Sequence, residues 1–127
     1  MREEVSPLAF AILADNVALY AHILDVSEAL QALKDNDWQV RTAAAMALEE
    51  IGPKAAEAVP ILIQTLKKDK REDVRRAAAE ALGSIKPTAI EAITVLTQAL
   101  EDQSAYVRWA AAKALSAITE RRSRERQ

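Results

Sequence analysis

A twelve-residue string of the form VRxAAAxALxxI occurs three times in this chain. It reads VRTAAAMALEEI at residues 40–51, VRRAAAEALGSI at 74–85 and VRWAAAKALSAI at 107–118. Apolar residues recur in it at three- and four-residue spacing, which predicts a helix with one apolar face. The copies begin 34 and 33 residues apart. A repeat of this period is typical of stacked helical units that bury their apolar faces against one another.

The repeat unit is longer than this string. After the first copy, apolar residues follow at offsets of 8, 11 and 15 from its last isoleucine, and the same offsets recur after the second copy. These residues are Val59, Leu62 and Leu66 in the first case and Ile93, Leu96 and Leu100 in the second. Their spacing predicts one more helix per unit, which we name helix A, and the string then forms helix B. Short charged turns join A to B and offer Asp or Ser side chains as helix caps. We therefore expect an all-α fold, a short solenoid of antiparallel helix pairs.

The N-terminal part departs from the repeat. Residues 7–24 do not match the string, and we interpret them as a capping helix B, because terminal repeats are commonly atypical. Residues 27–34 are expected to supply helix A of the first full unit. The polar stretch 120–127 either extends the last helix or frays. The expected organisation is a single repeat domain at 1–119, with N-terminal capping helices at 7–34 and matched units to 118, followed by an Arg-rich polar tail at 120–127.

Composition excludes several classes of function. The 127 residues carry 17 Lys and Arg against 19 Asp and Glu, so no overall positive field attracts a nucleic acid. The chain has no cysteine, which excludes disulfides, thiolate metal ligands and a cysteine nucleophile. The apolar run at 8–24 is interrupted by Asp15, Asn16 and His22, which predicts a core helix of a soluble protein and no membrane span. A cytoplasmic location is expected.

No catalytic constellation is recognisable in the sequence. It shows no nucleophile paired with a base, no paired carboxylates and no glycine-rich phosphate loop, so we expect no enzyme activity, no cofactor and no metal site. His22 is the only histidine and is expected in the core or at its boundary. Gly52 and Gly83 are interpreted as helix punctuation.

The period, the helix pairs and the string together resemble the HEAT-like repeat family, of the type found in phycobilisome lyase subunits. The segments EAVPILIQTL and VRRAAAEALGSI carry most of this resemblance, which covers roughly residues 27–118. It implies a right-handed stack, with A helices on the convex side and B helices lining a concave side where partners bind. It also implies an inter-repeat ladder, in which the arginine of one unit hydrogen-bonds the turn of its neighbour. The ladder residues are Arg41, Arg75 and Arg108 with Asp35, Asp69 and Asp102. A functional anion site is the rival interpretation of these arginines.

The positions that vary between copies predict a binding surface. The third letter of the string is Thr42, Arg76 or Trp109, and the seventh is Met46, Glu80 or Lys113. They follow one stripe of helix B, away from the stripe that builds the core. We expect Trp109 to be partly exposed, where it either anchors a partner or covers the open end of the last repeat, while Trp38 is expected to pack. The predicted partner-binding set is Trp109, Arg76, Glu80, Lys113, Met46, Thr42 and Tyr106. Glu49 and Glu50 also vary freely.

The favoured function is a non-catalytic scaffold or adaptor that binds another protein along the concave helix-B face. One alternative, which rests on the resemblance, is an accessory subunit or chaperone of the bilin lyase type acting on phycobiliproteins. A DNA- or RNA-binding helical repeat is less favoured, because Glu72 and Glu80 interrupt the positive track that phosphates require. A homo-oligomer formed through an uncapped terminal repeat is a further expectation.

Overall fold

The structure is a computed structural model that describes residues 17–87 and 90–126. Within these ranges every regular element is a helix. The elements are α2 (Val17–His22), α3 (Val26–Ala32), α4 (Trp38–Ile51), the 3₁₀ segment η1 (Gly52–Ala58), α5 (Val59–Lys68), α6 (Glu72–Ile85), α7 (Ile90–Ala99) and α8 (Ala105–Arg126). The first part of the capping helix expected at 7–24 lies outside the described residues, and α2 is its described end.

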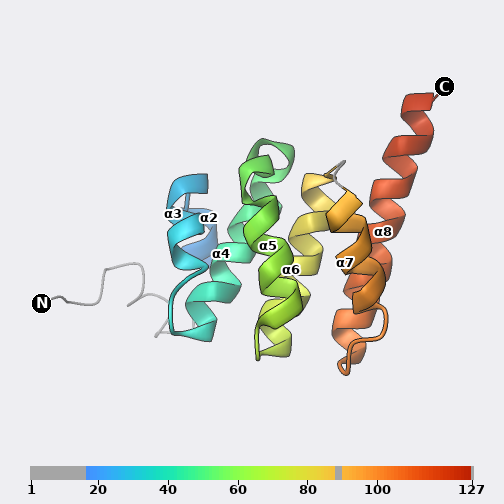
Figure 1. Cartoon of the computed structure of the whole chain (residues 1–127). Helices are drawn as coiled ribbons and strands as arrows, with labels where there is room; N and C mark the ends of the chain where they lie inside the picture. The colour runs from blue at the N-terminus through green and yellow to red at the C-terminus, as the bar shows by residue number, and fades with distance from the viewer. Residues whose placement is uncertain (1–16, 88–89, 127) are drawn as a thin grey trace, which may run out of the picture.

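The helices form two layers that run side by side along the molecule. Figure 1 shows α3, α5 and α7 in the front layer and α2, α4, α6 and α8 behind them. The most extensive contacts join α4 to α6 and α6 to α8, and α2 packs against α4. The A helices therefore lie in one layer and the B helices in the other, and the expected short all-α solenoid is confirmed.

The B helices approach one another closely because their contacting residues are small. Every alanine of the AAA runs in α4 and α6 is buried. A Cβ atom built on Gly83 of α6 would lie 2.8 Å from both Cα and Cβ of Ala114 in α8. The interpretation of Gly83 as helix punctuation is therefore wrong, because it lies inside α6 where α8 leaves no room for a side chain. Gly52 does end α4, with a φ of 72° that favours glycine.

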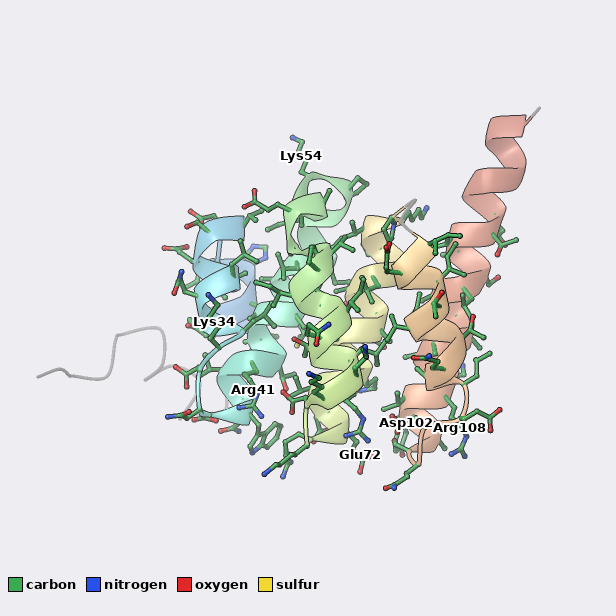
Figure 2. All side chains as sticks on the ribbon, viewed as in Figure 1. Lys34, Arg41, Lys54, Glu72, Asp102 and Arg108 are labelled. Atoms are coloured by element: carbon green, nitrogen blue, oxygen red, sulfur yellow. The ribbon has the colours of Figure 1, made fainter. Side chains whose placement is uncertain are left out.

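Two arginine–aspartate pairs join successive units at the turns between A and B helices. Arg41 donates from Nε to Asp69 Oδ2 over 2.7 Å and from Nη2 to Asp69 Oδ1 over 3.1 Å. Arg75 makes the same two bonds to Asp102, over 2.9 and 3.0 Å. Such forked bonds fix both distance and orientation between charged groups. Arg41, Asp102 and Arg108 lie along the same edge of the molecule in Figure 2.

The third guanidinium nitrogen of each ladder arginine, Nη1, hydrogen-bonds the backbone of the turn in its own unit. Arg41 Nη1 donates to the carbonyl oxygens of Asp35 and Asn36, both over 2.9 Å. Arg75 Nη1 donates to the Asp69 carbonyl over 2.9 Å, and Arg108 Nη1 donates to the Asp102 carbonyl over 2.7 Å.

The Asp35 carboxylate differs from its counterparts in the later units. It accepts from the Asp37 N–H over 2.8 Å, and it has no arginine side chain as a partner among the described residues. Asp35 therefore enters the ladder through its backbone carbonyl, which Arg41 holds.

The caps of the B helices differ between units. Asp37 caps α4 by accepting from the Gln39 N–H over 2.9 Å, and the Ser104 hydroxyl accepts from the first turn of α8. Helix α6 follows Arg71 and has no side-chain cap, so the expected Asp or Ser cap is absent there. Its first turn contains Glu72 and Asp73, whose negative charges favour a helix N-terminus.

The end of α8 agrees with one of the two alternatives for the polar stretch, and the end of α2 differs from the expectation. Helix α8 continues to Arg126, so the stretch extends the last helix. The His22 side chain is 75% exposed and lies 3.4 Å from Glu50 through its Nδ1 atom. The expectation of a histidine in the core or at its boundary is wrong, because His22 is the last residue of α2 and its side chain is exposed.

Replacement of Gly83 by alanine tests the contact between α6 and α8. The added methyl group meets Ala114, so we expect the free energy of unfolding to fall by about 1–3 kcal/mol, as in other overpacked cores. Urea denaturation measures this change. The control is Ser116→Ala at the equivalent, exposed position of α8, which is expected to change stability by no more than about 0.5 kcal/mol. Equal effects of the two substitutions would contradict the close contact.

The Asp102→Asn variant tests one pair of the ladder. Burial raises the pKa of the Asp102 carboxyl, but hydrogen bonds from Arg75 and from the Ser104 N–H outweigh it, so the pKa is lowered overall. A carboxyl with a lowered pKa stabilises the fold above its unfolded pKa, and this contribution is lost as the pH falls through its folded pKa. We expect the variant to lose about 1–3 kcal/mol at neutral pH.

The same substitution is expected to have no effect in acid below the folded pKa of Asp102, where the parent carboxyl is also uncharged. Urea denaturation of both proteins at about pH 7 and about pH 2 gives the comparison. A stability difference that is independent of pH would show that the charge on Asp102 does not stabilise the stack.

Candidate functional site

A cavity of about 210 Å³ opens between the B helices α4, α6 and α8. Its floor is built from small residues, because the same alanines and glycine that allow close helix packing leave little side-chain volume there. Charged side chains surround this floor. The lining residues are Glu49, Glu80, Gly83, Ser84, Lys86, Ala110, Lys113, Ala114 and Ala117. We refer to this hollow as the B-helix cavity.

Two carboxylates, Glu80 and Glu49, line the acidic side of the cavity, and only Glu80 forms an ion pair with a described residue. Glu80 accepts from Arg76 Nη1 over 2.9 Å, an ion pair between residues four apart on α6. Glu49 is half-buried, and its carboxylate has no hydrogen bond or salt bridge among the described residues. Burial raises the pKa of the Glu49 carboxyl, and the negative charge of Glu80 raises it further. The positive charges of Lys113 and Arg76 lower the pKa of this carboxyl and offset part of the rise.

The basic side of the cavity is continuous with an exposed aromatic ring. Trp109 is 58% exposed, and Lys113 Nζ lies 4.8 Å from the centre of its ring. Lys113 lines the cavity, so this cation–π contact connects the indole to the cavity rim. The arrangement places an apolar floor, both signs of charge and a large aromatic surface next to one another.

The structure brings four of the predicted partner-binding residues together: Arg76, Glu80, Trp109 and Lys113. Met46 is only partly exposed and packs against the core. Thr42 is 6% exposed, and its hydroxyl donates to the Trp38 carbonyl over 2.9 Å. The prediction that Thr42 contacts a partner is wrong, because the side chain is buried and its hydrogen bond is made within its own helix.

Tyr106 lies apart from the B-helix cavity. It is 71% exposed and lines a separate, open hollow near the turns, together with Glu72 and Arg75. Trp38 also belongs to the turn edge, where the Arg71 guanidinium carbon lies 3.9 Å from the centre of its ring. This contact joins the first unit to the second.

The sequence singles out Glu49 as a freely varying position, but neither Glu49 nor Ser84 belongs to the predicted partner-binding set, although both line the cavity. The Ser84 hydroxyl donates to the Glu49 carbonyl over 2.6 Å and so links α6 to α4. The two residues occupy the tenth and eleventh letters of the string, and both letters vary between the copies. Variation alone does not reveal which neighbour a position faces, and this is why Ser84 was missed.

None of the helices in the described part of the chain is both long and apolar enough to cross a membrane. Residues 17–87 and 90–126 contain no group of three or more His, Cys, Asp or Glu side chains placed to hold a metal ion.

Comparison with known families agrees with the helix pairs described above. A family model described as HEAT repeats matches residues 59–126, and a second one, described as HEAT repeat, matches residues 26–55. A search of curated proteins finds no match to the chain. The two family matches do not identify the phycobilisome lyase type among HEAT repeats.

Replacement of Glu49 by glutamine tests the electrostatics of the cavity. A carboxyl whose pKa is raised on folding disfavours the folded state above that pKa, since the charged form is better solvated in the unfolded chain. We therefore expect Glu49→Gln to raise the free energy of unfolding at neutral pH and to have no such effect in acid, where both side chains are neutral. Thermal unfolding across a pH series measures this, with exposed Glu57→Gln as the control. A destabilised variant at neutral pH would contradict the prediction.

Proposed function

We propose that this chain, which belongs to the HEAT repeat family, is a non-catalytic scaffold that binds another protein along its B-helix layer. HEAT repeats generally mediate protein–protein interaction, and proteins that contain them are typically non-enzymatic scaffolds. The proposed contact surface consists of the B-helix cavity together with Trp109 and Arg76. Met46 contributes at its margin.

One observation carries the proposal: an exposed tryptophan adjoins a cavity with an apolar floor and charged walls. Tryptophan and arginine are the residue types that most often dominate protein–protein binding energy, typically where a side chain fills a pocket. Trp109 offers a large apolar area, and Lys113 keeps one face of its ring close to the cavity rim. A protruding side chain of the partner is expected to enter the cavity while its neighbouring residues cover Trp109.

The rigidity of the surface supports the same proposal. Helices α4, α6 and α8 are held by contacts between buried alanines and by the ladder, so the surface exists before a partner binds. Little side-chain or loop ordering is then required on association, and more of the contact energy appears as affinity. The Arg76–Glu80 ion pair also holds both side chains in one arrangement.

The charge pattern favours a protein partner over a nucleic acid. Glu49, Glu80, Lys86 and Lys113 line the cavity, and Arg76 pairs with Glu80 beside it. A phosphate backbone binds to a continuous run of positive charge and is repelled by interspersed carboxylates. A protein surface can match both signs at short range, which favours one partner over others.

A double variant, Trp109→Ala with Arg76→Ala, tests the proposed surface. The partner is first recovered from the native source with the parent chain as bait and identified, and its affinity for each variant is then measured by calorimetry. We expect the dissociation constant to rise at least about tenfold, in line with losses at dominant interface residues.

The matched control for this experiment is Gln64→Ala with Gln98→Ala, which changes two exposed residues of the A-helix layer. It is expected to leave affinity unchanged, and circular dichroism checks that both double variants remain helical. A partner that binds the Trp109/Arg76 variant as tightly as the parent, or that loses affinity only with the A-layer variant, would place the binding surface elsewhere.

A further inference from the structure

The outer side of α8 repeats a helix face that is buried in the preceding units. Ala45 of α4 and Ala79 of α6 are fully buried, whereas the equivalent Ala112 of α8 is exposed. Gly83 of α6 packs directly on α8, whereas the equivalent Ser116 is exposed. Helix α8 therefore presents the surface on which the earlier B helices stack, and no described residue covers it. Figure 1 shows α8 as the last helix of the stack.

Arg108 lies on this surface, and part of its guanidinium has no carboxylate partner among the described residues. Its Nη1 donates to the carbonyl oxygens of Asp102 and Gln103, over 2.7 and 3.2 Å, as the other ladder arginines do in their own turns. In Arg41 and Arg75, the Nε and Nη2 atoms bind the aspartate of the next unit. The structure gives these two atoms of Arg108 no carboxylate partner within the described residues, and the side chain is exposed.

The same surface also contains an exposed carboxylate, Glu120. Arg108, Ala112, Ser116 and Glu120 are spaced four residues apart and so form one ridge of α8. We name this ridge the end face. Twelve residues of helix separate Arg108 from Glu120 by about 18 Å along the axis, so the two charges cannot pair within one chain. The end face thus has a positive end, a middle of small side chains and a negative end.

We propose that a second copy of this chain covers the end face, with the two α8 helices antiparallel about a two-fold axis between Ala112 and Ser116. This arrangement places Arg108 of each copy opposite Glu120 of the other, and Ala112 opposite Ser116. A two-fold interface requires such a self-complementary surface, in which each contact occurs twice. The small residues at the centre let the helix axes approach closely, and packing of two four-residue ridges is the commonest helix contact in globular proteins.

The position of the axis agrees with the length of the helix. The point between Ala112 and Ser116 lies near the middle of α8, which spans Ala105–Arg126, so the two helices cross near their middles. The forked bond that Arg75 makes to Asp102 shows the geometry that Arg108 can adopt toward a carboxylate. The small α8 residues that line the B-helix cavity, Ala110, Ala114 and Ala117, lie on another side of the helix, whereas Trp109 directly follows Arg108 and borders the end face.

Sedimentation equilibrium of the full chain over a wide concentration range tests the dimer. The parent is expected to approach twice the 13.9 kDa chain mass as its concentration rises. The Ser116→Arg variant puts a large charged side chain at the centre of the interface and is expected to remain monomeric. Gln64→Arg, an equal change at an exposed position of α5, is the matched control and is expected to dimerise like the parent.

Charge reversal tests the geometry of the contact. Arg108→Glu and Glu120→Arg are each expected to raise the dimer dissociation constant about tenfold or more, since each places like charges opposite one another. Combining the two restores opposite charges across the axis and is expected to recover dimerisation. Circular dichroism verifies that each variant is folded.

Two outcomes would overturn the proposal. A parent chain that remains monomeric at every concentration would show that copies do not pair, and the end face would then be open to a different helical partner. A dimer that Ser116→Arg does not disrupt, or that the double charge reversal does not restore, would show that the copies pair through another surface.

Discussion

The stacking of one unit on the next depends on the forked hydrogen bonds between an arginine and the following aspartate. Each guanidinium holds its own turn with Nη1 and the next turn with Nε and Nη2. Because its planar fork fixes the direction as well as the distance of a carboxylate, the pair determines how neighbouring turns are oriented. Each unit contacts only its neighbours, so this link and the packing of the B helices on one another together shape the whole stack.

The candidate site is a consequence of the same stacking. Helices that meet through alanine and glycine come close together, and their small side chains leave a hollow on the surface beside the contact line. The cavity floor of Ala110 and Ala114 belongs to the same stretch of α8 that excludes a side chain at Gly83. Varied residues such as Glu80 and Lys113 then supply the charge around it. The packing contacts and the proposed binding surface therefore use adjacent faces of the same helices.

The helix pairs and the ladder could be predicted from the sequence, and the detailed surface could not. The three copies of the string aligned Arg41, Arg75 and Arg108, and the preceding aspartates aligned with them, so their recurrence was visible without coordinates. Thr42 aligned equally well with Arg76 and Trp109, yet it is buried while Trp109 is exposed. Equivalent letters occupy different environments because the neighbours on either side of each unit differ.

The sequence by itself determined the type, order and period of the helices, because apolar spacing and turn composition act over a few residues at a time. Only the tertiary structure decided which side of each B helix is covered, because burial depends on the next unit in the stack. Gly83 is the clearest case: its place in the string indicates nothing about its contact, and α8 leaves no room there for a side chain. In α8 the equivalent Ser116 is exposed, since no described helix lies against it.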